Sequence, residues 1–99
     1  MTVEVTSDAL FDLWDGHKFY EKQTKGLGGY FRQCIEQDLT DLQRTAGIHS
    51  KIRGYHHVKS KVFQSLVFYR THQNTAFVMA ILDGRMDPAT RDRILDERS

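Results

Sequence analysis

The hydrophobic pattern of the first half of the chain has the period of an α-helix. Residues Thr2–Val5 alternate apolar and polar positions, as in an edge strand, and Thr6, Ser7 and Asp8 after them are suited to capping a helix. Apolar and aromatic positions then recur three or four residues apart, which predicts a first helix of about 16 residues. Its stripe consists of Leu10, Leu13, Trp14, His17 and Tyr20. A second stripe predicts a helix that ends before Gly47, because glycine readily closes a last turn. That stripe consists of Leu27, Phe31, Cys34, Ile35, Asp38, Leu39 and Leu42.

A short glycine-rich turn joins the two predicted helices. The segment Thr24–Gly29 reads TKGLGG, and its glycines permit backbone conformations with positive φ. A connection this short makes the helices antiparallel neighbours, so the sequence predicts an αα-hairpin.

The second half of the chain has the pattern of strands. Residues Ile52–Lys61 predict a half-exposed strand, Phe63–Thr71 predict a more apolar one, and His72–Asn74 form the turn after it. The continuous apolar run Thr75–Leu82 predicts a central strand buried on both faces. After a loop over Asp83–Asp87, Pro88 can begin a short helix over Ala89–Leu95.

This order predicts one α+β domain over residues 1–99, with the elements β-α-α-β-β-β and a possible short C-terminal helix. The helical hairpin packs on one face of a small, twisted, mostly antiparallel sheet. The other face is then expected to be free and to carry the basic side chains of the strands.

Composition limits the classes of protein that remain. The 39% apolar content is enough for a packed core, and the single cysteine, Cys34, cannot form an internal disulfide. No signal peptide and no membrane-spanning run is visible, so we expect a cytoplasmic protein without a membrane partner.

Charge is distributed unevenly along the chain. Between Asp41 and Asp83 there is no carboxylate, whereas the same stretch holds six basic residues and four of the five histidines. Residues 1–45 carry five basic and eight acidic side chains, and residues 46–99 carry nine and five, so a net +1 conceals a dipole. One basic and one acidic surface favour an anionic partner such as nucleic acid or an acidic protein segment.

The spacing of His and Cys residues gives little indication of a metal site or a catalytic nucleophile. His56 and His57 are adjacent, so a strand directs them to opposite faces, and no CxxC, HxxxH or HExxH motif is present. His17 and Cys34 lie on apolar helical stripes and are expected to be core residues. We therefore expect no metal site and no cofactor.

The basic strands are the remaining candidate site. Alternation places five residues on one strand face, namely Arg53, Tyr55, His57, Lys59 and Lys61. Tyr69 and Arg70 end the next strand, and Arg85 follows the last one. Basic groups interleaved with Tyr and His suit phosphate neutralisation and base stacking. They also suit phosphoryl transfer, with His56 or His57 as acid or base. The alternative is an ordinary solvated face, above all for Lys51, Lys59 and Lys61.

Four segments, in order, resemble the ParE/RelE superfamily of bacterial toxin–antitoxin toxins. They are FYEKQTKGLGGYF (Phe19–Phe31), HSKIRGYHHV (His49–Val58), VFQSLVFYR (Val62–Arg70) and AILDGRMDP (Ala80–Pro88). The first resembles the helical hairpin of ParE-like members, the second and third resemble the family's hairpin strands, and the last resembles its closing segment.

The resemblance implies a small cytoplasmic toxin that an antitoxin neutralises in a hetero-oligomer, with an acidic–apolar antitoxin segment lying over the toxin. DNA would be contacted only indirectly, through the antitoxin complex. RelE-like members cut messenger RNA on the ribosome, often with a late Tyr, and ParE-like members inhibit DNA gyrase. Here no Tyr follows Tyr69, and the GLGGYF turn is ParE-like.

The sequence also departs from the ParE-like pattern at four positions, namely Val62, Gln64, Asp83 and Met86. Three of these departures remove basic or titratable groups, so altered target choice or weakened toxicity is one reading. Another reading is that the protein is an inactive relative that retains only antitoxin binding. Arg70, Arg85, Asp87 and Pro88 match the pattern, although the last two also suit a helix start.

The favoured hypothesis is a plasmid-stabilisation toxin that binds and inhibits gyrase without turning over a substrate. Its expected target-binding residues are Lys59, Lys61, His57, Tyr69, Arg70 and Arg85. Its expected antitoxin-binding residues are Arg53, Tyr55, Phe19 and Tyr30, although burial in the core is favoured for Phe19 and Tyr20. The alternative is a ribosome-dependent mRNA endonuclease that uses His56, His57, Arg70 and Arg85.

Overall fold

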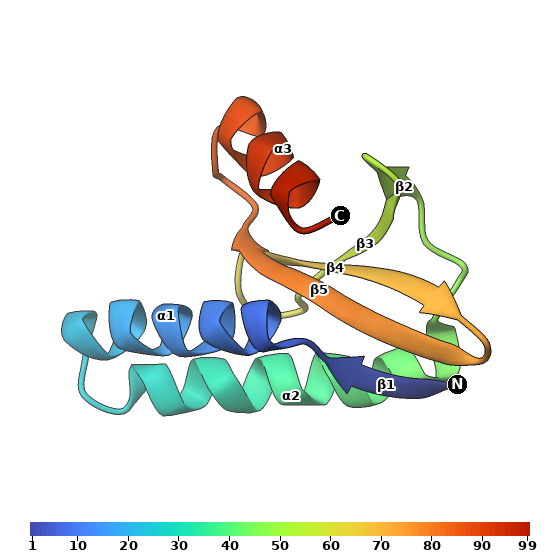
Figure 1. Ribbon diagram of the computed structural model, residues 1–99. Coiled ribbons are helices and arrows are strands. Elements are labelled where there is room, and N and C mark those ends of the chain that lie inside the picture. The colour runs from blue at the N-terminus through green and yellow to red at the C-terminus, as the bar shows by residue number, and fades with distance from the viewer.

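The computed structural model describes residues 1–99 as a strand, a helical hairpin, a four-strand segment and a final helix (Figure 1). The elements are β1 (Thr2–Val5), α1 (Ser7–Gln23), α2 (Leu27–Thr45), β2 (Lys51–Ile52), β3 (Tyr55–Lys59), β4 (Ser65–His72), β5 (Thr75–Asp83) and α3 (Pro88–Glu97). The predicted α+β class and element order are confirmed. None of the three helices has both the length and the apolar character needed to cross a bilayer.

The five strands form one sheet in the order β1-β5-β4-β3-β2. β1 runs parallel to β5, and the other neighbours are antiparallel, so the predicted edge strand lies at a parallel edge. The strand expected over Ile52–Lys61 is divided in two, because Arg53 and Gly54 adopt positive φ angles of 54° and 83° and form a tight turn.

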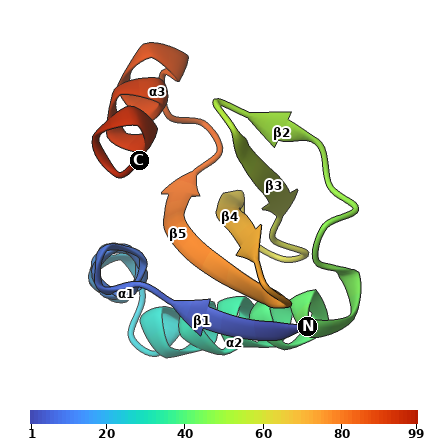
Figure 2. The same ribbon diagram turned by 45° about the vertical axis from the view of Figure 1, so that its right-hand side comes forward.

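The α1–α2 hairpin covers one face of the sheet, as predicted. Figure 1 shows the two helices side by side below β5, and Figure 2 shows α1 nearly end-on with α2 running behind β1. Ten buried residues join the hairpin to this face, and they include Leu13 and Ile35 from the helices and Val67 and Val78 from the sheet. Their alternation along β4 and β5 explains why these strands read as apolar runs.

The hairpin turn is held by a carboxylate. Glu21 accepts hydrogen bonds from the backbone N–H groups of Gly26 and Gly28, both at 2.9 Å. These bonds hold the pKa of Glu21 below its ordinary value. Gly26 has φ of +88°, whereas Gly28 permits close approach, since a Cβ there would lie 2.4 Å from the carbonyl oxygen of His17.

The opposite face of the sheet is partly covered, which corrects the expectation that it is free. Leu95 of α3 is fully buried in a second cluster with Tyr55, Phe68, Ala80 and Leu82 from the sheet. Helix α3 begins as predicted, with Pro88 in its first turn and the Asp87 carboxylate accepting the N–H of Thr90. The sequence predicted this helix but not the surface it covers.

Candidate functional site

Three of the predicted target-binding residues share the α3 side of the sheet. Lys59 and His57 alternate with Tyr55 along β3, and Arg70 lies on the neighbouring strand β4. The Arg70 guanidinium lies 4.2 Å from the centroid of the Tyr55 ring and donates to Ser99 Oγ at 3.3 Å. Lys59 is exposed, and Nδ1 of His57 is buried without a hydrogen-bond partner.

Arg53 and Lys61 are instead engaged in ion pairs within the chain. Arg53 pairs with Asp96 of α3, and Lys61 pairs with Asp41 of α2. The pKa of Asp96 is lowered by the Arg53 guanidinium, and that of Asp41 is lowered mainly by Lys61. Both pairs are exposed, so solvent screens them and they stabilise the fold little.

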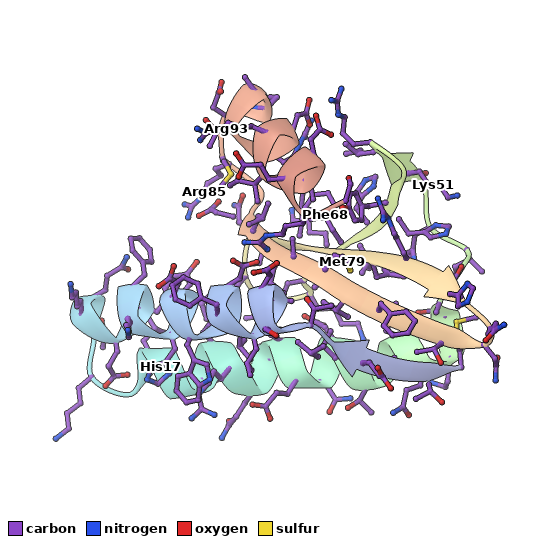
Figure 3. All side chains as sticks on the ribbon, viewed as in Figure 1. His17, Lys51, Phe68, Met79, Arg85 and Arg93 are labelled. Atoms are coloured by element: carbon purple, nitrogen blue, oxygen red, sulfur yellow. The ribbon has the colours of Figure 1, made fainter.

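Arg85 is held by its neighbour in the β5–α3 connection. The Asp83 carboxylate accepts from the Arg85 side chain at 3.0 and 2.8 Å, and this pairing lowers the pKa of Asp83. Figure 3 shows Arg85 beside the start of α3 and Lys51 beside β2, on opposite sides of the view. The residues of the expected basic site therefore do not form one surface. Lys59 and Arg70 lie on the α3 side of the sheet, Lys61 lies against α2, and Arg85 lies in the β5–α3 connection.

His56 and His57 do not form a catalytic pair. His56 lies on the hairpin side of the sheet, stacked on Tyr69 with ring centroids 4.9 Å apart, and its Nδ1–H donates to the His49 carbonyl at 2.7 Å. The Tyr69 hydroxyl lies 2.5 Å from Nδ1 of His49 and accepts the N–H of Gly47 at 2.8 Å. This network ties the α2–β2 connection to the sheet, so His56 has a structural setting.

Two tyrosines expected to contact partners lie in the core. Tyr55 and Tyr69 are both 0% exposed. The Tyr55 hydroxyl donates to the Leu95 carbonyl at 2.8 Å, which joins β3 to α3. Either ring would have to leave its packed position to contact a partner. Both rings therefore have a structural role in the fold.

An aromatic cluster forms where the hairpin meets the β3–β4 connection. Tyr20, Phe31 and Phe63 pack with ring centroids 4.7 to 5.2 Å apart, and Phe19 and Tyr30 flank them at 5.1 and 5.8 Å. Tyr20 is half-buried as expected, but Phe19 is 53% exposed, so the prediction that Phe19 is a core residue is wrong. Phe19 and Tyr30 are available to a partner.

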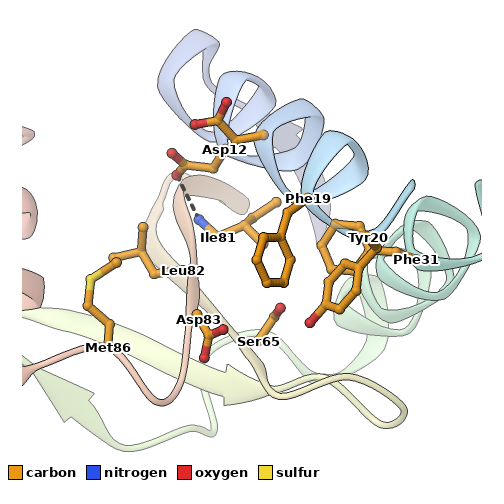
Figure 4. A pocket seen from close by; sticks show the side chains of 11 residues that line it. Asp12, Phe19, Tyr20, Phe31, Ser65, Ile81, Leu82, Asp83 and Met86 are labelled. Atoms are coloured by element: carbon orange, nitrogen blue, oxygen red, sulfur yellow. Dashed lines mark hydrogen bonds between the residues drawn. The ribbon is translucent and has the colours of Figure 1, made fainter. Parts of the chain in front are cut away.

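Beside Phe19, α1 and the end of β5 form most of a cavity of about 260 Å³ that is open to solvent. Figure 4 shows Phe19 of α1 beside Ile81, Tyr20 next to Phe31, and Leu82 and Met86 on the other side. The sequence offered no sign of this cavity, because its two main walls, α1 and the end of β5, are more than 60 residues apart.

Asp12, at one wall of the cavity, joins three elements. Its carboxylate accepts the Ile81 N–H of β5 at 3.0 Å and two bonds from Arg98 at 2.5 and 2.9 Å. Arg98 also donates to the Met79 carbonyl at 3.1 Å, and Asp12 raises the pKa of Arg98. The Asp12 and Arg98 side chains are only 9% and 17% exposed, so this pair is the most buried in the chain.

His17 and Cys34 show no sign of metal chemistry. His17 Nδ1 accepts from the Arg32 side chain at 3.3 Å, and its ring packs against Trp14. Cys34 is partly buried on α2. No cluster of three potential metal ligands occurs.

Neither a protein-family model nor a curated protein sequence matches the chain. The chain is similar to a solved structure described as the chromosomal ParDE TA system from P. aeruginosa, with a TM-score of 0.73. The alignment covers 84% of this chain and 95% of that chain at 18% sequence identity. At this identity the likeness shows a shared fold.

Proposed function

We propose that the protein is the toxin of a type II toxin–antitoxin module and is neutralised by a tightly bound antitoxin. The fold shared with a chain of a ParDE system supports this proposal, and the four sequence segments that resemble ParE-like toxins support it independently. The cytoplasm is the compartment in which such a toxin would act.

The observation that carries the proposal is the pairing of that fold with an exposed aromatic surface. Phe19 and Tyr30 are 53% and 50% exposed, and both flank the same aromatic cluster instead of standing singly on the surface. A protein partner that covers them would remove this surface from solvent and gain the corresponding free energy.

Binding to DNA gyrase, rather than substrate turnover, is the proposed mode of action. Tyr55 and Tyr69 are buried and Arg53, Lys61 and Arg85 are already paired, which leaves little of the constellation that cleavage of RNA requires. Lys59 and Arg70 remain as cationic groups without a carboxylate partner, suited to docking an anionic surface.

The test is expression of the chain from a tightly repressed promoter, with pulse labelling of DNA, RNA and protein synthesis. Early loss of DNA synthesis with filamentation is expected, and Lys59→Ala with Arg70→Ala should reduce it. Lys25→Ala, at an exposed lysine of the hairpin turn, is the matched control. Undisturbed growth at verified expression would contradict the toxin proposal and leave the inactive relative as the better reading.

An mRNA endonuclease is the second candidate, and one observation favours it. Nδ1 of His57 has no partner, and this ring shares the α3 side of the sheet with Lys59 and Arg70. If this ring is a catalytic base, His57→Ala should abolish toxicity and early protein synthesis should be the first to fail. His72→Ala, at an exposed histidine, is the control, because His56 has a structural role.

A further inference from the structure

The cavity beside Phe19 has the size and lining of a pocket for one large apolar side chain. An enclosed apolar cavity of roughly 150 Å³ accepts a benzene ring, and this one measures about 260 Å³. Phe19, Tyr20, Ile81, Leu82 and Met86 supply apolar walls (Figure 4). The cavity opens to solvent beside Phe19, which is half-exposed, so a ring or branched chain from outside can enter it.

The charged groups that line the cavity are all carboxylates, namely Asp12, Asp15 and Asp83. Two of these are neutralised within the chain, since Asp12 pairs with Arg98 and Asp83 pairs with Arg85. Asp15 is exposed and has no ion-pair partner in the chain.

Helix α1 extends this acidic edge away from the cavity. Positions 8, 12, 15 and 19 are separated by four, three and four residues, so Asp8, Asp12, Asp15 and Phe19 lie along one flank of the helix. Asp8 is exposed and unpaired like Asp15. A partner that follows this flank therefore meets the free carboxylate of Asp8 first and that of Asp15 at the wall of the cavity.

We infer that the cavity and the adjoining flank of α1 dock a protein segment that places one large apolar side chain in the cavity and a Lys or Arg against Asp15. The inference rests on the proposed function in assigning the segment to the antitoxin. It gives this part of the antitoxin a charge opposite to that of the acidic segment expected over the basic strands. The antitoxin would then carry two segments of opposite sign, one for each surface.

The first test uses matched probes and does not depend on toxicity. 4-Phenylbutylamine and 4-phenylbutyrate share one ring and differ in the sign of the terminal charge. In NMR titrations of the labelled protein, the amine should shift the amides of Phe19, Ile81 and Met86 and bind about fivefold more tightly than the acid. Equal binding, tighter binding of the acid, or shifts confined to β3 and β4 would overturn the inference.

Two variants locate the interaction. Asp15→Lys should abolish the preference for the amine, and Phe19→Ala should weaken both probes. Glu4→Lys, which alters an exposed, unpaired carboxylate on β1, should change neither titration. Preference for the amine that survives in Asp15→Lys would contradict the assigned contact.

A partner-level test separates this inference from the proposed function. In co-expression with the protein's antitoxin, Asp15→Lys should weaken the complex at least tenfold while Glu4→Lys leaves it intact. An antitoxin that binds Asp15→Lys normally would overturn the inference but not the toxin proposal. A dimer of the protein alone that Phe19→Ala dissociates would assign the cavity to a second copy and equally overturn it.

Discussion

The two faces of the sheet are covered by helices in different ways. The α1–α2 hairpin meets its face mainly through ten buried residues, and the bond from the Ile81 N–H to Asp12 is one of its few polar contacts. Helix α3 meets the other face through five buried residues, of which only Leu95 belongs to the helix, and through polar contacts at Tyr55, Arg53 and Arg98. The hairpin face thus depends on apolar burial, and the α3 face on directed bonds as well.

This difference separates the effects expected of mutations. Truncation of a buried apolar side chain beneath the hairpin loses the transfer free energy of the removed atoms and their packing contacts, and no other group replaces them. A broken contact beneath α3 instead leaves a polar group without its partner, and the cost depends on how deeply that group is buried. Comparison of the two kinds of substitution shows which face limits the stability of the whole domain.

The largest expected effect is that of Phe31→Ala beneath the hairpin. Phe31 is 2% exposed and packs against Tyr20 and Phe63, so its truncation should lower the free energy of unfolding by about 3–5 kcal/mol. Urea unfolding followed by circular dichroism measures this change. Phe11→Ala is the control, because Phe11 is 65% exposed and its loss should cost less than about 0.5 kcal/mol. Equal losses in the two variants would contradict the assigned core.

Asp12→Ala should have the next largest effect, because it leaves the Ile81 N–H without an acceptor and the Arg98 guanidinium without its carboxylate. The expected loss is about 2–4 kcal/mol, and amide exchange at Ile81 should accelerate. Asp8→Ala, on the same flank but exposed, is the matched control. The double variant Asp12→Ala with Arg98→Met should recover part of the loss, since it removes the stranded charge. Failure to recover any of it would assign the whole cost to the Ile81 bond.

The hairpin face was largely predictable from sequence, and the α3 face was not. Stripes such as Leu13 and Phe31 recur with the helical period because a single buried surface selects them, so the helices and their contact face follow directly. Tyr55 shares its strand face with His57 and Lys59, and a face with these residues has the pattern of one exposed to solvent. Only the position of α3 in space shows that Tyr55 is buried.

The site was predicted less well, for a similar physical reason. Asp12 and Arg98 are 86 residues apart, and no local pattern brings them together. The strand turn at Arg53 and the extra residue Met79 in β5 change which side chains share a face, and neither has a strong sequence signal. Core burial is favoured for both Phe19 and Tyr20, but adjacent residues of a helix point in different directions, and only Tyr20 is half-buried.

A pH-dependent contact at His49 sharpens the comparison, because it adds a titratable polar contact to the side of the sheet that depends mainly on apolar burial. When Nδ1 of His49 carries no proton, it accepts the hydrogen of the Tyr69 hydroxyl, which lies 2.5 Å away. Burial of the ring lowers the pKa of His49, and the nearby His56 and His57 lower it further. Protonation would leave the Tyr69 proton without an acceptor inside the fold.

The sign of the pH effect follows from that lowered pKa. Above the unfolded value of about 6.5, neither state binds the proton at His49 and the stabilisation is complete. As pH falls from there through the folded pKa, the unfolded state binds more protons, so the free energy of unfolding decreases. Unfolding midpoints in urea at pH 7.5 and 5.5 should therefore differ more in the wild type than in His49→Gln, whose amide still accepts the Tyr69 bond. His72→Gln, at an exposed site, should keep the wild-type difference. This change in stability should be the smallest of the three predicted. If the midpoint of His49→Gln differs between the two pH values as much as that of the wild type, the other histidines carry the pH dependence.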